Sequence, residues 1–526
     1  MGQTYLGTGK YSNAQGTVCS PSTGAAIDPT YTTFTCTVAN ADGGYSVISG
    51  VPAVSAGGAP NFATLAAYVA GNHGANAILL GDITTKATGA NSVAIGNGAN
   101  ASKDDAIAFG TGATASGTNS VAIGLKSTAS GASAYALGEN AKAVGDNSVA
   151  LGADTSSNTA YGVAIGRNVS STGQSAIALG GGSATGGAAK ADGTGAIAIG
   201  SGGSSTKGAQ ATDSQAIAIG EGAKASKGQS IAIGKSAAAS QASAIAMGNG
   251  AQAKGENSIS IGTGNKVSGN NSGAIGDPSI INGANSYSVG NNNTIGSTTT
   301  DAFALGNGIY LGATSGGVDT TSVTGAVALG SSSSVTTLGG VALGQNSVAS
   351  TAAGVAGYDP KTGLSSTLTT ATWKSTLGAV SVGNGTTATR QITGVAAGTA
   401  DTDVVNVAQL KSTQTHFYSV NSTDATAGNY NNNGATGINA IAIGSGATNS
   451  QLDAIVIGTN AVANYKSGQV SIGANAFGSA NQVLLPRGTI TTINVPGGSP
   501  SNYGQAGVAI GSNAAYNATN ASGVSI

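Results

Sequence analysis

Large and small apolar residues alternate in short segments along most of the chain, and each segment ends in a glycine. A segment such as Val93-Ala94-Ile95-Gly96 has two bulky residues around a small one. Alternation with a period of two predicts a short β-strand with one bulky face and one face that admits only small groups. The terminal glycines recur mostly at intervals of fourteen residues, with steps of twenty before Gly200 and Gly220: Gly96, Gly110, Gly124, Gly138, Gly152, Gly166, Gly180, Gly200, Gly220, Gly234, Gly248, Gly262, Gly276, Gly290, Gly306, Gly330 and Gly344.

A second, smaller alternation follows each of these glycines. It has Ala at every other position, as in Ala99 and Ala101, and is usually closed by another glycine such as Gly117, Gly145 or Gly255. We interpret it as a second strand, with glycines at the corners where the backbone takes a positive φ. The fold class is therefore all-β: a parallel β-solenoid, or β-roll, in which fourteen residues form one coil of two strands.

The bulky residues cannot be enclosed by so small a coil, whose interior admits only Ala-sized groups. Ordering fourteen residues costs on the order of 20 kcal/mol, and burying two aliphatic side chains returns roughly 3 to 6 kcal/mol. Neighbouring coils and neighbouring chains must supply the rest. We therefore predict a homo-oligomer in which the rows of Val, Ile and Leu meet along a common axis, with Gly273 as a gap in the row. The pattern leaves open which strand face points to that axis.

Composition and charge exclude several functions. The chain has 526 residues, of which 87 are Gly and 7% are charged, and 19 Lys and Arg balance 20 Asp and Glu. With no basic run, nucleic acid and anionic lipid are not expected partners. Only His73 and His416 are present, far apart in sequence, and neither is near a cysteine, so we expect no enzyme, no metal site and no cofactor. No apolar stretch is long enough to cross a membrane, so we expect any anchor to lie C-terminal to this sequence.

Cys19 and Cys36 lie seventeen positions apart in a segment rich in Gly, Ser and Thr. We interpret them as one disulfide, which indicates an oxidising compartment and contributes about 3 kcal/mol in the chain-entropy model; two free thiols are the alternative. Residues 1–80 do not repeat and hold seven of the 21 Phe and Tyr residues. We predict that they form an N-terminal cap domain over the first coil. Their aromatic side chains form either a binding surface or a small core.

Residues 392–411 read ITGVAAGTADTDVVNVAQLK, which closely resembles the neck motif of trimeric autotransporter adhesins of the YadA type. The fourteen-residue units resemble the head repeats of the same family, and together the two resemblances cover most of the chain. The resemblance implies a left-handed β-roll, three chains around a threefold axis, and a neck with a short helical segment that leads into a coiled coil. The number three and the left hand come from this resemblance alone.

The resemblance also assigns roles to particular residues. Asp401, Asp403, Asn406 and Gln409 occupy polar positions of the neck pattern, where we expect helix capping and hydrogen bonds between chains; the alternative is a solvated surface. Trp373 lies in a segment similar to the Trp-containing connector of the family. We expect it either at the trimer axis or as a local core anchor.

The predicted domain order follows from these segments. Residues 81–350 form the first head, 351–391 the connector, 392–415 the neck and 416–526 a second head, because the strand pattern restarts at Ile441. The chain stops one residue short of a repeat's glycine, so we expect it to be a fragment of a longer fibre.

The function implied by the family is attachment. We expect a bacterial adhesin, exposed at the cell surface and outer membrane, that binds a host matrix protein or cell-surface receptor by multivalent trimeric contacts. A passive spacer, with binding elsewhere in the fibre, is the alternative. Insertions that break the period are the expected contact elements, although they could instead brace neighbouring subunits. They are 181–195, 201–215, 307–325 with Tyr310, and 474–505 with Tyr503. The ligand itself is not encoded in any motif.

Overall fold

The computed structural model describes most of the chain, in two compact units formed by Met1–Gly394 and Val395–Ile526. The described residues are 3–7, 10–13, 18–21, 33–39, 45–52, 60, 62–183, 186–203, 205–360, 362–414, 420, 422–463, 470–478, 482–485, 507–510 and 524–525.

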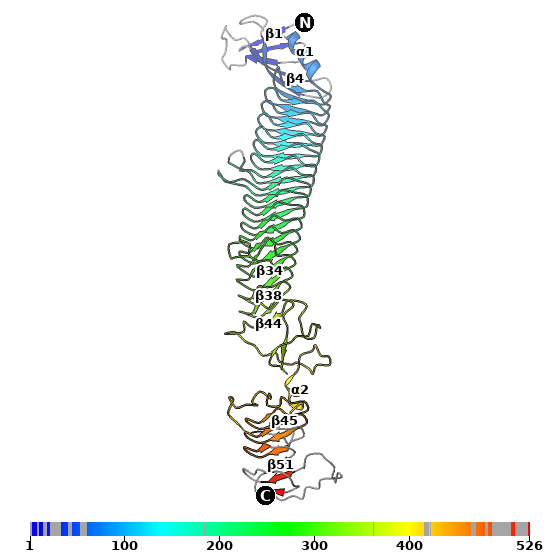
Figure 1. The fold of residues 1–526 in the computed structure, drawn as a ribbon. Coiled ribbons are helices and arrows are strands. Elements are labelled where there is room, and N and C mark those ends of the chain that lie inside the picture. Colours follow the sequence, from blue (N-terminus) through cyan, green and yellow to red (C-terminus); the bar gives the residue numbers. More distant parts are fainter. Residues whose placement is uncertain are drawn as a thin grey trace. The chain divides into compact units, whose positions relative to one another are not determined.

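Most of the first unit is a parallel β-solenoid whose coils stack into a long rod (Figure 1). Each coil contributes one strand to each of two parallel sheets, as the sequence predicts. Strands of the first sheet are β6 (Ile78–Asp82), β8 (Val93–Ile95), β10 (Ile107–Phe109), β12 (Val121–Ile123), β14 (Tyr135–Leu137), β16 (Val149–Leu151), β18 (Val163–Ile165), β20 (Ile177–Leu179), β22 (Ile197–Ile199), β24 (Ile217–Ile219), β26 (Ile231–Ile233), β28 (Ile245–Met247), β30 (Ile259–Ile261), β32 (Gly273–Ile275), β34 (Tyr287–Val289), β36 (Phe303–Leu305), β38 (Val327–Leu329) and β40 (Val341–Leu343).

The second sheet is built from two-residue strands. They are β7 (Lys86–Ala87), β9 (Asn100–Ala101), β11 (Thr114–Ala115), β13 (Thr128–Ala129), β15 (Lys142–Ala143), β17 (Ser156–Ser157), β19 (Ser170–Ser171), β21 (Lys190–Ala191), β23 (Gln210–Ala211), β25 (Lys224–Ala225), β27 (Ala238–Ala239), β29 (Gln252–Ala253), β31 (Lys266–Val267), β33 (Ile280–Ile281), β35 (Thr294–Ile295), β37 (Tyr310–Leu311), β39 (Ser334–Val335) and β41 (Val348–Ala349). The register is constant, so residues of equal phase form straight rows, for example Ile107 between Val93 and Val121.

The core between the two sheets is a column of small residues. Ala94 of the first sheet and Ala101 of the second are fully buried, and the same holds coil after coil. Bulky neighbours on the first strands point outward, which confirms the predicted division of the two faces.

In the C-terminal coils of the first unit the core contains larger residues than the sequence predicts. Val267, Ile281, Ile295 and Leu311 replace Ala in the second sheet and are fully buried. Buried asparagines fill the adjoining corner: the Asn265 side-chain amide donates to the Ile261 carbonyl at 2.8 Å. The expectation that the interior admits only Ala-sized groups is therefore wrong for these coils, where Val, Ile, Leu and Asn side chains occupy the interior.

The corner glycines fall into two kinds, of which the sequence analysis recognised one. Every glycine that ends a first strand has a positive φ, for example 129° at Gly248. Gly117, Gly145 and Gly255 do not. Positive φ at that corner is instead held by Asn119, Asn147 and Asn257, because Asn tolerates the left-handed region. Gly117 has another role: an added Cβ would lie 1.9 Å from the Gly131 carbonyl oxygen of the next coil.

The N-terminal segment adds an antiparallel meander to the first sheet. Its strands are β1 (Gln3–Gly7), β2 (Lys10–Asn13), β3 (Val18–Pro21), β4 (Thr33–Ala39) and β5 (Tyr45–Pro52), followed by helix α1 (Phe62–Asn72). Strand β5 pairs in parallel with β6, so the meander continues into the solenoid. The predicted disulfide is present and joins Cys19 of β3 to Cys36 of β4. Phe34 is fully buried beside it, so this aromatic side chain belongs to the core.

A connector ends the first unit. It contains a hairpin of β42 (Tyr358–Asp359) and β43 (Leu364–Ser365) and a last strand, β44 (Val380–Ser381), that pairs with β40. The Arg390 guanidinium donates to the Gln345 carbonyl at 2.6 Å and to the Ser347 hydroxyl at 3.0 Å. An added Cβ on Gly344 would lie 2.7 Å from the guanidinium carbon, so Arg390 covers the corner where another coil would otherwise stack.

The second unit begins with helix α2 (Val407–Ser412) and then repeats the solenoid pattern. Its strands are β45 (Ile441–Ile443), β46 (Thr448–Asn449), β47 (Ile455–Ile457), β48 (Val462–Ala463), β49 (Val470–Ile472), β50 (Phe477–Gly478), β51 (Gln482–Leu485), β52 (Gly507–Ile510) and β53 (Val524–Ser525). Among the residues that the structure describes, no helix has the length and apolar character needed to span a bilayer.

Gly248 and Gly250 provide a matched test of the corner geometry. An added Cβ on Gly248 would lie 2.3 Å from the Gly262 carbonyl oxygen, whereas at Gly250, with φ 66°, it meets nothing within 4 Å. We expect Gly248→Ala to cost about 2–4 kcal/mol, because it combines strain with a backbone clash, and Gly250→Ala about 1 kcal/mol. Thermal unfolding followed by circular dichroism measures both. Equal midpoints for the two variants would contradict this account of the corner.

Candidate functional surfaces

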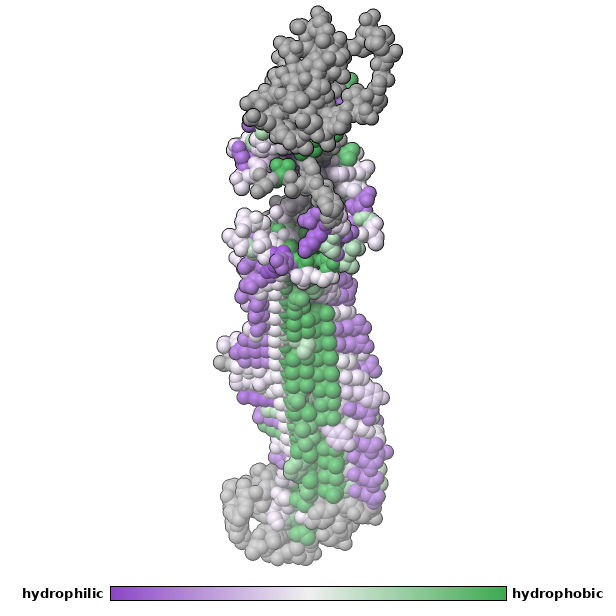
Figure 2. All heavy atoms as spheres, turned by 90° about the horizontal axis from the view of Figure 1, so that it is seen from below, coloured by the Kyte–Doolittle hydropathy of each residue, from purple (hydrophilic) through white to green (hydrophobic). Residues whose placement is uncertain are grey.

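The first sheet presents a continuous apolar stripe to the outside of the rod. We call the outward residues of β8 to β40, the first and third of each strand, the apolar stripe. Figure 2 shows it as a green band with a few pale positions, flanked by polar rows. The exposed fraction of its side chains reaches 49% at Phe109 and Ile275. At about 4.8 Å per strand, the eighteen first strands from β6 to β40 extend over about 85 Å.

The one glycine in the stripe does not interrupt it. An added Cβ on Gly273 would lie 2.7 Å from Cδ1 of Tyr287, the residue one coil further on. The Tyr287 ring therefore lies over the gap that the sequence analysis noted. An apolar surface this long is far larger than the patches that monomeric proteins ordinarily expose, and it is typical of an interaction surface.

The opposite face of the rod carries an outer row, which we define as the first residues of the second strands from β7 to β41. It is polar for most of its length. Five exposed lysines stand in this row, without an acidic residue among its members: Lys86, Lys142, Lys190, Lys224 and Lys266. The sequence analysis missed this row because it looked for contiguous basic runs. The available signal was a shared phase in the fourteen-residue period.

The insertions lie at coil corners and are shorter than predicted. The predicted ranges 181–195 and 201–215 include β21 and β23, which are regular strands. The Ala189 amide donates to the Gly180 carbonyl at 2.9 Å, and the Ala209 amide to the Gly200 carbonyl at 3.0 Å. These bonds close the corners as in an ordinary coil. In the third insertion the ten extra residues lie within 312–323, which we call the insertion loop. Tyr503 lies outside the described residues, and so does most of 474–505.

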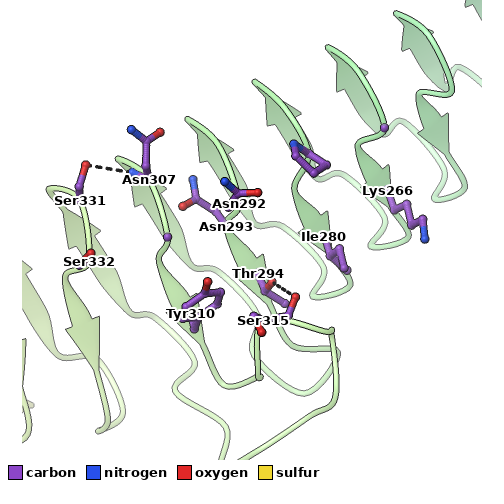
Figure 3. A pocket seen from close by; sticks show the side chains of 13 residues that line it. Lys266, Ile280, Asn292, Asn293, Thr294, Asn307, Tyr310, Ser315, Ser331 and Ser332 are labelled. Atoms are coloured by element: carbon purple, nitrogen blue, oxygen red, sulfur yellow. Dashed lines mark hydrogen bonds between the residues drawn. The ribbon is translucent and has the colours of Figure 1, made fainter.

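Tyr310 lies on strand β37 and not in the insertion loop. Its side chain is 39% exposed and belongs to the outer row, three coils beyond Lys266. Together with the insertion loop it lines an open hollow of about 630 Å³ (Figure 3). Ile280 and Thr294 form its floor between Lys266 and Tyr310.

Three of the four predicted neck residues form a local hydrogen-bonded turn. Asn406 caps α2: its side chain accepts from the Gln409 amide at 2.9 Å, and the Gln409 side chain accepts from the Asn406 amide at 3.2 Å. Asp403 accepts from the amides of Thr399 at 2.8 Å and Ala400 at 3.0 Å. Asp401 is exposed in the same turn. The capping role is present within one chain, and hydrogen bonds between chains stay a prediction.

Trp373 is half-buried in the connector. Its carbonyl accepts from the Gly357 amide at 2.7 Å, and its own amide donates to the Thr370 carbonyl at 3.0 Å. These bonds fix the backbone at Trp373 within its own chain, and its place at a trimer axis stays a prediction. Of the two histidines, His73 lies within 2.8 Å of the Ala77 carbonyl through Nε2, and His416 lies outside the described residues.

The solenoid thus presents an apolar stripe on one face and a polar row on the other, and an apolar surface of this length is typical of a repeat protein with an interaction surface. Comparison with known proteins agrees. The family model described as "YadA head domain repeat (2 copies)" matches 87–113, 101–127, 129–155, 143–168, 211–237, 225–251, 239–265, 253–277 and 435–461. The model described as "Coiled stalk of trimeric autotransporter adhesin" matches 391–440. In its head repeats and its stalk segment the chain is therefore similar to trimeric autotransporter adhesins of the YadA type.

One curated relative and one solved structure illustrate the similarity. The autotransporter adhesin BadA of Bartonella henselae is 47% identical over 94 residues, which is 18% of this chain and 3% of BadA. The chain therefore spans only a small part of this curated relative. The crystal structure of the collagen-binding domain of the Yersinia adhesin YadA aligns at 23% identity and a TM-score of 0.23, over 38% of this chain and 81% of that domain.

The neck turn provides a pH-dependent test. Hydrogen bonds from the Ala400 and Thr399 amides lower the pKa of the Asp403 carboxyl. A lowered folded-state pKa contributes stability that is present above the ordinary Asp pKa of about 3.9 and is lost as the pH falls through the folded value. We expect an NMR titration of this carboxyl, assigned with Asp403→Asn, to show a midpoint below 3.9. A midpoint at or above the ordinary value would contradict the turn.

Proposed function

We propose that this chain is the surface-exposed part of a bacterial adhesin that attaches cells to host extracellular matrix or host cells. The matches to head repeats and to the coiled stalk of an adhesin family support this proposal. The observation that carries it is the apolar stripe, because a rod that must associate with copies of itself presents several identical outer faces at once. Repetition of weak contacts then gives avidity.

Three copies are the proposed assembly, with their apolar stripes turned toward a common axis. The number three is taken from the family of trimeric autotransporter adhesins. The neck needs partners for the same reason as the head: α2 has no buried residue, and the exposed fractions of Val405, Val407 and Leu410 are 66%, 67% and 64% in the single chain. Exposed apolar side chains at the start of a helix favour a bundle of helices.

The proposed location is the outer surface of the cell. The disulfide between Cys19 and Cys36 supports an oxidising location. The apolar stripe and the outer row have the chemistry of binding surfaces, so we propose attachment rather than catalysis.

Charges placed in the apolar stripe test the assembly. We expect the double variant Ile231→Asp, Ile233→Asp to lower the free energy of unfolding of the assembly by about 2–4 kcal/mol per chain, because two charges would be buried without partners. The measurement is the thermal unfolding midpoint as a function of protein concentration, since association makes the midpoint depend on concentration.

The double variant Gln210→Asp, Gln252→Asp is the matched control, because it places the same two charges in the outer row, on the opposite face of the rod. It should leave the midpoint unchanged within error. If charges on the two faces changed the unfolding midpoint equally, the apolar stripe would have no special role in assembly.

Attachment is tested by coating surfaces with collagen, fibronectin, laminin or epithelial cells and measuring retention of the purified protein. We expect saturable retention on at least one of them, stronger for the wild type than for the stripe variant, because avidity depends on the number of joined chains. If the protein were retained on none of these surfaces while the complete fibre adhered, this part would instead be a spacer.

A further inference from the structure

The hollow beside Tyr310 is formed by the outer row and the insertion loop together. Ile280, Thr294 and Tyr310 follow one another in the row, on β33, β35 and β37. The loop folds back across two earlier coils: an added Cβ on Gly317 would lie 3.4 Å from Cγ2 of Ile280. Figure 3 shows Ser315 of this loop opposite Thr294 and next to Tyr310. The hollow therefore has a floor of strands and one raised wall.

The wall is held in place by its own hydrogen bonds. Asp319 accepts from the amide of Ser297 at 2.7 Å and also from the Ser297 hydroxyl. The Thr314 amide donates to the Val318 carbonyl at 2.8 Å, and the Val323 amide donates to the Thr299 hydroxyl at 3.1 Å. A wall fixed at both ends loses little conformational entropy when a ligand binds.

The lining of the hollow suits a sugar with an acidic group. Tyr310 offers a partly exposed aromatic ring and Ile280 an apolar surface, which can pack against the less polar face of a sugar ring. The side chains of Asn292, Asn307 and Ser332 offer amide and hydroxyl groups to sugar hydroxyls. Lys266 is the single charged residue of the lining, so the hollow favours an anion.

The outer row extends this positive character along the rod. Lys224 stands three coils from Lys266, about 14 Å at the usual strand spacing, and Lys190 two coils further. Lys190 is partly offset by Asp192, whose carboxylate lies 2.9 Å from the ammonium group. Cations at intervals along a straight rod attract a linear polyanion better than a small anion, because each adds its own attraction.

We propose that the hollow and the lysines of the outer row bind a linear acidic polysaccharide. One sugar ring packs against Tyr310, and acidic groups of the polysaccharide contact Lys266 and Lys224. The inference rests on the proposed adhesin function and names its ligand class. A nucleic acid fits less well, since the outer row has one aromatic residue and no arginine, whereas amides and hydroxyls line the hollow. A polysaccharide needs few stacking contacts and many polar ones.

Three immobilised probes test the proposal with the full chain: heparin, which is sulfated, hyaluronan, which is carboxylated, and dextran, which is neutral. We expect retention on heparin, weaker retention on hyaluronan and none on dextran. Lys266→Gln with Lys224→Gln should make heparin binding less salt-dependent, since fewer charge contacts remain. Tyr310→Ser should weaken binding about fivefold at constant salt, because a ring contact is lost.

The variants preserve the fold, because Gln252 and Ser334 already occupy the outer row. Unfolding midpoints check this. Lys103→Gln with Lys227→Gln, at the corner beyond the second strand, is the control with the same loss of two charges, and should bind heparin like the wild type. Wild-type affinity in both the variant Lys266→Gln with Lys224→Gln and the variant Tyr310→Ser would overturn the proposal, as would tighter binding of double-stranded DNA than of heparin.

The outcome for adhesion is separate. Protein that attaches to matrix proteins or cells, but is not retained on heparin or hyaluronan, would overturn the polysaccharide site and leave the adhesin intact. Retention on heparin that depends on Lys266 and Tyr310, without attachment to any coated surface or cell, would support the site and contradict the proposed function.

Discussion

The space between the two sheets of the solenoid is the constraint on which the rest of the structure depends. Over most of the rod it is one alanine deep on each side, with Ala94 against the layer of Ala101 and so on along the stack. In these coils the Val, Ile and Leu side chains of the first strands lie outside the core, and Val169, at a corner, is a buried exception. The same narrow core that allows a regular thin rod thus produces the apolar stripe, and the stripe is the surface through which we propose that copies of the chain associate.

Constant register turns each position of the repeat into a row with one chemistry. The apolar stripe, the outer row with its five lysines and the corner asparagines are all rows of this kind. Their side chains lie about 4.8 Å apart along the rod, regardless of how far apart they are in sequence. Lysines that occur only every few coils are thereby aligned in one row along the rod. The insertion loop departs from this regularity and forms a raised wall beside the outer row.

Much of the fold could be predicted from the sequence, because alternation and a fixed period determine strands, register and the small interior. The strand pattern also located the bulky outer residues of the first sheet. Details that depend on three-dimensional contacts were not accessible. Examples are the Tyr287 ring over Gly273, the return of the insertion loop over Ile280 and the close approach that requires Gly117. The outer row was missed for a different reason, since its lysines are scattered in sequence and meet only when coils stack. Asn406 and Gln409 were recognised from a motif, and their capping bonds are local enough to form within one chain.

The mass of the unmodified chain in solution tests the central claim most directly. If the apolar stripe has to be covered by other copies, light scattering on the purified protein should give about three times the 49.6 kDa of one chain, and dilution should not release monomers before unfolding. A soluble, folded monomer of 49.6 kDa that persists at high concentration would contradict the account, because the stripe would then be stable in water.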